Sequence, residues 1–120
     1  MGGPLAPHVF LLRLKPLLAS KSLAWDPRNR RKTREFMIEE GLFEDDAYEI
    51  IGRLGPEHYV WGPERDDNGT RGEVWRFSFP YTKQTPPRKP IRLYIKLKIW
   101  TDALGDAGIV MSFHDEGNYE

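Results

Sequence analysis

Residues Ile91–Trp100 read IRLYIKLKIW, and along this segment aliphatic side chains alternate without a break with polar or aromatic ones. Because successive side chains of a β-strand point to opposite faces, this alternation predicts a strand with two different faces. One face is aliphatic and needs a hydrophobic core: Ile91, Leu93, Ile95, Leu97 and Ile99. The other is cationic and aromatic: Arg92, Tyr94, Lys96, Lys98 and Trp100. The second face suits a ligand that has both negative charge and planar aromatic rings, as nucleic acid does. A half-solvated strand of an ordinary antiparallel sheet has the same pattern.

The composition bounds the class of protein. At 120 residues, with 39% hydrophobic and 12% aromatic residues, the chain is expected to fold as a single domain, residues 1–120, around one core. It contains no cysteine, which excludes disulfides and thiolate metal sites. The three histidines, His8, His58 and His114, have no metal-ligand spacing. We therefore expect no metal and no other cofactor.

Charge and hydropathy narrow the location and the partners. The apolar run at residues 9–18 is interrupted by Arg13, Lys15 and Pro16, is too short to span a membrane and lacks a signal-peptide cleavage site. We therefore expect a cytoplasmic protein without membrane contact. The formal net charge is zero, which argues against a strongly basic nucleic-acid binder, but eight Lys or Arg and one acid fall within residues 1–34. A neutral protein with segregated charge can still present a local positive face.

The first half of the chain, residues 8–54, follows a loose lead-in at 1–7 and has apolar residues at helical spacing. It predicts helices at residues 8–20, 27–40 and 42–54. The first contains Pro16, so we expect a kink or a restart there, with a short strand as the alternative. The second is expected to begin at an Asp26 cap followed by Pro27 and to end at Gly41.

Residues 57–114 change to the two-residue period of strands. We expect an extended segment at 57–61, turns at 62–72, a strand at 73–81, a basic loop at 82–90, the strand at 91–100, a connecting turn at 101–108, a strand at 109–114 and a polar tail at 115–120. The last strand is expected to place Ile109, Met111 and Phe113 in the core and Val110, Ser112 and His114 on the other face. The order predicts an α+β domain with the N-terminal helices on one face of a small antiparallel sheet.

If consecutive strands pair, their outward side chains share one surface, and this surface has the groups that metal-free RNA cleavage needs. The reaction requires a base for the ribose 2′-hydroxyl, a cation for the phosphorane and an acid for the leaving 5′-oxygen. The candidate catalytic residues are Arg76, Tyr94, Lys96 and His114, with His114 or Tyr94 as acid or base. The candidate RNA-binding residues are Lys98, Trp100, Arg92, Lys83 and Arg88. Each also has an ordinary explanation as a surface or cross-strand side chain.

Several short motifs occur in a characteristic order through most of the chain: Pro7-His8, Lys15-Pro16-Leu17, Gly41-Leu42-Phe43, Ile50-Ile51-Gly52, Val74-Trp75-Arg76, Leu93-Tyr94-Ile95-Lys96 and Ile109-Val110-Met111-Ser112-Phe113-His114. In this order they resemble the MqsR-type toxins, which are mRNA interferases of bacterial toxin–antitoxin modules with a RelE-like fold. The resemblance implies a hydrolase that cleaves mRNA, free or on the ribosome, without a metal, and leaves 2′,3′-cyclic phosphate and 5′-hydroxyl ends. It also implies a cognate antitoxin protein as partner.

The resemblance implies that Tyr94 is catalytic, but the chain departs from the family at other positions. The family's glutamine falls on Arg76, and its final lysine falls on His114. Its upstream catalytic lysine falls near Trp61 and is missing, unless Lys83 or Arg88 replaces it.

Three functions are therefore open from the sequence. The first is an endoribonuclease toxin of a type II toxin–antitoxin module. The second is a nucleic-acid-binding domain without catalysis that uses the same face. The third is a small protein-interaction module that uses an exposed strand edge and the acidic helices.

Overall fold

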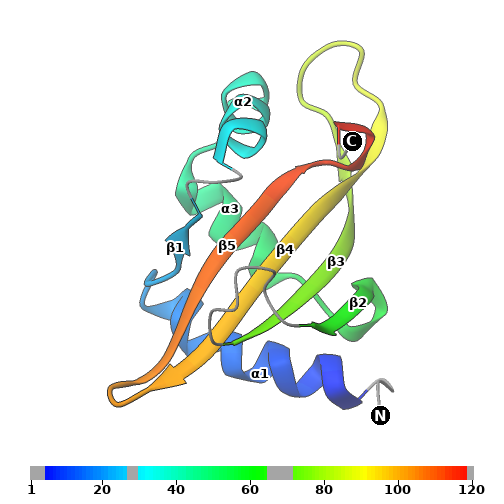
Figure 1. The fold of residues 1–120 in the computed structure, drawn as a ribbon. Coiled ribbons are helices and arrows are strands. Elements are labelled where there is room, and N and C mark those ends of the chain that lie inside the picture. The colour runs from blue at the N-terminus through cyan, green and yellow to red at the C-terminus, as the bar shows by residue number, and fades with distance from the viewer. Residues whose placement is uncertain (1–4, 27–29, 65–71, 119–120) are drawn as a thin grey trace.

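The structure is a computed structural model that describes residues 5–26, 30–64 and 72–118. In this part of the chain the helical elements are α1 (Leu5–Ala19), α2 (Arg30–Glu40), α3 (Glu44–Gly52) and two 3₁₀ turns, η1 (Pro56–His58) and η2 (Glu116–Asn118). The strands are β1 (Ala24–Trp25), β2 (Tyr59–Glu64), β3 (Glu73–Thr82), β4 (Pro90–Asp102) and β5 (Gly105–Asp115). Figure 1 shows the long strands β3, β4 and β5 side by side, with helices gathered behind and beside them. The α+β class and the order of helices before the sheet are confirmed.

The sheet has five strands in the order β1-β5-β4-β3-β2. The pairs among β2 to β5 are antiparallel, as expected from consecutive strands joined by short connections. β1 instead pairs in parallel with β5, at Ala24–Ile109 and Trp25–Val110, so the sheet is mixed. This strand was not expected from the sequence, because two residues are too few to show a strand period.

The predicted helices are present, with some changes at their ends. α1 is continuous through Pro16, so there is no restart at this proline. α2 ends at Glu40 as predicted, and the next residue, Gly41, has a φ of 70°, which favours glycine. The predicted start at Pro27 lies outside the described residues. α3 has Glu44, Asp45 and Asp46 in its first turn, where carboxylates favour the helix dipole.

The core lies between the helices and one face of the sheet, here called the inner face. The inner face of β4 is its aliphatic side, and Leu93, Ile95 and Leu97 are each 0% exposed. Side chains of α1 and α3, including Phe10 and Ile51, pack in the same cluster. At roughly 25 cal/mol per Å² of apolar surface, burial of these side chains is the main force that holds the helices on the sheet.

A β-bulge corrects the predicted faces of β5. Lys96 pairs with Ser112 but Leu97 pairs with Val110, so Met111 is an extra residue in β5. Val110 therefore lies on the inner face and is 2% exposed. Ile109, which was predicted to face the core, lies opposite Lys98 on the other face. Phe113 and His114 follow the bulge and keep their predicted sides.

The predicted connecting turn at 101–108 is also wrong. β4 continues to Asp102 and β5 begins at Gly105, so only two residues join the strands. Leu104 at this tip is 99% exposed. The hairpin extends beyond the core in Figure 1, and Arg13 of α1 binds it through Asp106, with 3.1 Å between Nη2 and Oδ1. Polar residues in a strand that has left the core resemble a turn in sequence, which explains the error.

Candidate nucleic-acid interface

The face of the sheet opposite the core, here called the outer face, gathers the four predicted catalytic residues. Tyr94 of β4 lies between Ser78 of β3 and His114 of β5. In the next row along the strands, Lys96 lies between Arg76 of β3 and Ser112 of β5. Directly opposite side chains of an antiparallel pair have Cβ atoms about 4.5–5.5 Å apart, so the two rows form one continuous cluster. The two serines were not assigned a role from the sequence.

His114 is buried in this cluster, with 3% of its surface exposed. Its Nδ1 lies 3.0 Å from the carbonyl oxygen of Asp115, and its ring centroid lies 5.4 Å from that of Tyr94. Burial, together with the charge of Lys32, lowers the pKa of His114 below its ordinary value, although the hydrogen bond to Asp115 opposes this shift. The imidazole is therefore neutral near pH 7. If Nδ1 carries the hydrogen and donates it to Asp115, Nε2 keeps a lone pair and is a base.

Arg76 is not the free cation that the sequence suggested. Its Nη2 lies 3.0 Å from Oε1 of Glu64 on the edge strand β2, and both side chains are about one-quarter exposed. Glu64 also accepts a hydrogen bond of 2.8 Å from the indole of Trp61. Within the described residues, the buried Nε of Arg76 has no acceptor. Glu64 is a member of the site that sequence reasoning missed, because it lies in the stretch that was predicted as turns.

The remaining cations of β4 differ in exposure. Lys96 is half-buried, whereas Lys98 is only 6% exposed and its Nζ lies 5.7 Å from the ring centroid of Trp100. A cation at this distance over an aromatic ring is attracted to it. Arg92 is exposed and donates from Nε and Nη2 to the hydroxyl and the carbonyl of Ser78, at 2.9 and 2.8 Å. Of the predicted RNA-binding residues on β4, Arg92 and Trp100 are therefore the more accessible.

The basic loop between β3 and β4 is fixed to α2 through Glu40. The buried carboxylate of Glu40 accepts hydrogen bonds from the backbone N–H of Gln84, at 2.6 Å, and the hydroxyls of Thr85 and Tyr81, at 2.7 and 3.3 Å. Burial, followed by the charge of Glu40, raises the pKa of Tyr81 to about 12. Burial alone would raise the pKa of Glu40, but these hydrogen bonds outweigh it and lower the pKa.

The two predicted RNA-binding cations of this loop differ in their contacts. Lys83 lies 3.6 Å from Glu39 of α2, measured between Nζ and Oε1. Arg88 is exposed. Because Lys83 is paired with α2, it does not replace the lysine that the family resemblance expects near Trp61, whose own side chain is 54% exposed on β2.

The described residues, 5–26, 30–64 and 72–118, offer neither a metal-ion site nor a membrane-spanning helix. They contain no group of three histidine, aspartate or glutamate side chains that could hold a metal ion. No helix among them is long and apolar enough to cross a membrane. In comparisons with known proteins, no family model, curated protein or solved structure matches the chain.

Proposed function

We propose that the outer face of the sheet binds RNA and cleaves it without a metal ion, as the mRNA interferase toxin of a type II toxin–antitoxin module. The observation that carries the proposal is the arrangement of Arg76, Lys96, Tyr94 and His114 on neighbouring positions of three strands. These four side chains are a base, two cations and a phenol within one cluster. The MqsR-like motifs in the sequence support the same activity.

The roles follow from the environment of each group. The neutral imidazole of His114 accepts the proton of the ribose 2′-hydroxyl at Nε2, and the 2′-oxygen attacks the phosphorus. Lys96 stabilises the charge of the phosphorane, and Tyr94 protonates the leaving 5′-oxygen. The bond from phosphorus to the 5′-oxygen breaks, which leaves a 2′,3′-cyclic phosphate and a 5′-hydroxyl. Arg76 has a smaller part, because Glu64 already neutralises it.

Substrate access sets a condition on this proposal. His114 is 3% exposed, so the groups around it must move before a ribose reaches its Nε2. Tyr94, which is half-buried, lies beside it and defines the direction of approach. Arg92 precedes Tyr94 on β4 and Trp100 follows Lys96, so they lie on opposite sides of the cluster. There the guanidinium can bind a phosphate and the indole can stack on a base.

The burial of His114 favours a second candidate function, which is RNA binding without cleavage. In that case the exposed Arg92 and the half-buried Lys96 and Trp100 contact the nucleic acid, and His114 is a packed side chain of the sheet. Both functions require affinity for RNA that falls as salt increases, because each phosphate contact releases counterions.

The two candidates are separated by incubating purified protein with end-labelled RNA in EDTA, with and without ribosomes. Cleavage by the wild type, with cyclic-phosphate ends, is expected to fall by about 10²–10⁴-fold in Tyr94→Phe and in His114→Gln. Lys15→Gln, which removes an exposed cation from α1, is the matched control and should cleave normally. Circular dichroism and thermal unfolding verify that each variant is folded.

Each possible result supports or contradicts a named candidate function. RNA that is bound but left intact by the wild type supports the second candidate and rules out the first. Cleavage that EDTA abolishes, or that both site variants retain, contradicts the proposed mechanism. If the wild-type protein neither binds nor cleaves RNA at low salt, both candidate functions are contradicted.

The toxin proposal also implies a cytoplasmic protein and an antitoxin that covers the outer face. Expression in bacteria is then expected to arrest growth, and Tyr94→Phe should relieve the arrest at equal protein levels. Equal toxicity of the wild type and this variant would contradict a role of the outer face in arrest.

A further inference from the structure

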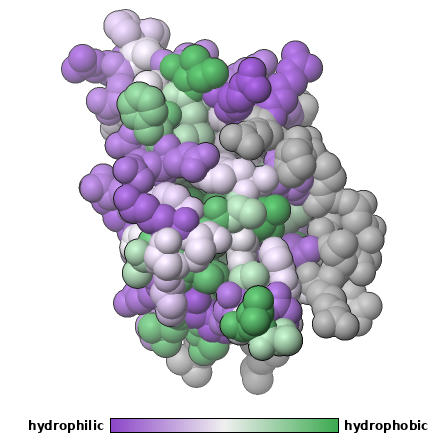
Figure 2. Space-filling model, turned by 90° about the vertical axis from the view of Figure 1, so that its left-hand side faces the viewer, coloured by the Kyte–Doolittle hydropathy of each residue, from purple (hydrophilic) through white to green (hydrophobic). Residues whose placement is uncertain are grey.

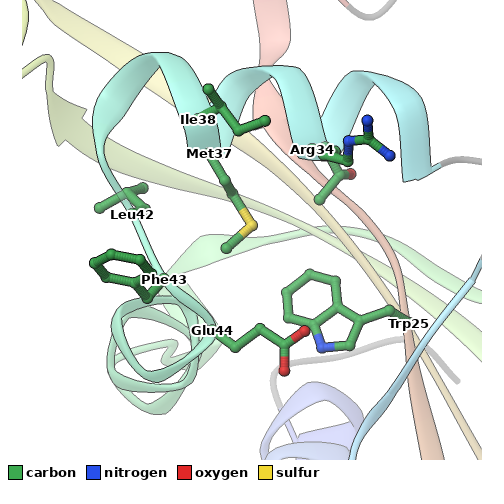
Figure 3. Close-up of a pocket in the computed structure, with 8 residues that line it drawn as sticks. Trp25, Arg34, Met37, Ile38, Leu42, Phe43 and Glu44 are labelled. Carbon is green, nitrogen blue, oxygen red and sulfur yellow. The ribbon is translucent and has the colours of Figure 1, made fainter.

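An apolar pocket lies between α2, β1 and the start of α3, away from the cluster on the outer face. Its volume is about 210 Å³. Figure 3 shows Trp25 at its base, with Met37 and Leu42 on the wall. Ligand sites for small molecules usually have about 300–1,000 Å³, so this pocket is suited to a single large side chain rather than to a metabolite.

The rim of the pocket exposes two large hydrophobic residues. Ile38 of α2 is 70% exposed and Phe43, just before α3, is 77% exposed. Figure 2 looks onto this side of the molecule and shows apolar side chains standing among polar ones. Exposed apolar surface beside an apolar hollow is typical of a protein interaction site.

The rim also carries one charge of each sign. Arg34 of α2 and Glu44 of α3 both line the pocket and are exposed. Neither of them forms an ion pair with a residue in the described parts of the chain, in contrast to Arg31 and Glu35 on the same helix, which lie 3.3 Å apart. The pocket therefore has a guanidinium and a carboxylate that are both available to a partner.

A two-fold symmetric contact would satisfy both charges at once. In such a contact, if one residue of the first copy meets a second residue of the other copy, the reverse pair also forms, so every pair occurs twice. Arg34 of each protomer would face Glu44 of the other, and Phe43 of each would enter the pocket of the other. An aromatic side chain that fills a pocket is the usual anchor of an interface.

We propose that the surface formed by Trp25, Arg34, Met37, Ile38, Phe43 and Glu44 binds a second copy of this chain in a two-fold symmetric dimer. An unrelated partner would need its own pair of opposite charges in matching positions, whereas a second copy has them by symmetry. This proposal is independent of the RNA proposal, because the pocket shares none of its lining residues with the outer-face cluster.

The test is a charge-reversal experiment read by sedimentation equilibrium and by light scattering over a wide range of concentration. The wild type is expected to be a dimer that dissociates on dilution. Arg34→Glu and Glu44→Arg should each weaken the dimer by at least about tenfold, because like charges then face each other twice. An equal mixture of the two variants should recover the wild-type affinity as a heterodimer, in which both pairs are again of opposite charge.

Three further variants, one at the anchor and two as controls, keep the test decisive. Phe43→Ser removes the anchor while leaving a residue that suits the start of a helix, and it should produce a folded monomer. Arg53→Glu and Glu57→Arg reverse exposed charges that do not line this pocket, and should leave the dimer unchanged. A wild type that is monomeric at every concentration, a mixture that does not recover, or controls that dissociate equally would each overturn the proposal.

Discussion

The two faces of β4 have the same periodicity but different physical roles. On the inner face, Leu93, Ile95 and Leu97 are fully buried, and packing against the helices accounts for all of them. On the outer face, Lys98 is nearly as buried, whereas Lys96 beside it is only half-buried. An ordinary solvated face would expose both lysines to a similar degree. Alternation in the sequence therefore reports which way a side chain points but not how much water reaches it.

The largest expected loss of stability is at the inner face of β4. Ile95→Ala removes three carbons from a site with 0% exposure and is expected to lower the free energy of unfolding by about 2–5 kcal/mol. The matched change on the outer face, Lys96→Ala, should cost about 0.5 kcal/mol or less. Urea unfolding followed by circular dichroism measures both. Equal losses would mean that the outer face is a second core, which contradicts a binding function for it.

A smaller effect is expected at Val74, which lies on the outer face but is 1% exposed. It lies opposite Lys98, which is 6% exposed, so these two side chains form a covered row between the catalytic candidates and Trp100. Val74→Ala is expected to lower the free energy of unfolding by about 1–3 kcal/mol, since about 0.8 kcal/mol is lost for each buried CH₂ and a cavity remains. The same urea titration measures it. No loss would mean that water reaches Val74 in solution, contrary to its burial.

A comparison of β4 with β5 shows how far the sequence predicts the structure. Residues Ile91–Trp100 point as predicted, because side-chain direction in a strand depends only on the local chain. The faces of Ile109 and Val110 were wrong, because a bulge depends on how two strands pair and leaves no mark in either strand alone. The ion pair of Arg76 with Glu64 could not be predicted either, since it joins two strands across an irregular register.

The same division holds for the candidate site, where side-chain direction was predictable and contacts between distant segments were not. Parity alone placed Arg76, Tyr94, Lys96 and His114 on one face, as the strand pairing now shows. The burial of His114 and Lys98 and the attachment of Lys83 to Glu39 arise from contacts between distant segments. Such contacts are set by tertiary packing, which outweighs any local preference of these residues for solvent.

His114 provides a pH-dependent test of the outer face. Its pKa is lowered by burial, so the unfolded chain binds a proton more readily than the folded protein. Stability is then fully present above the ordinary pKa of about 6.5 and declines as the pH falls below it. His114→Gln cannot titrate and should show a smaller decline in urea midpoint between about pH 8 and pH 5. An equal decline in both proteins would indicate that His114 is exposed to water in solution, contrary to its place in the cluster.

The smallest effect is expected where β4 and β5 leave the core and the two faces cease to differ. There Arg13 binds Asp106, and Asp106 also accepts a hydrogen bond of 2.7 Å from Thr101. The hydrogen bond with Arg13 lowers the pKa of Asp106 below its ordinary value. Both partners are about one-third exposed, and surface ion pairs of this kind contribute about 0.2–1 kcal/mol. Arg13→Gln should therefore reduce the urea midpoint only slightly, and less so in high salt, whereas the amides of the hairpin tip should exchange with solvent faster. A loss as large as that of Val74→Ala would mean that the hairpin belongs to the cooperative core rather than extending from it.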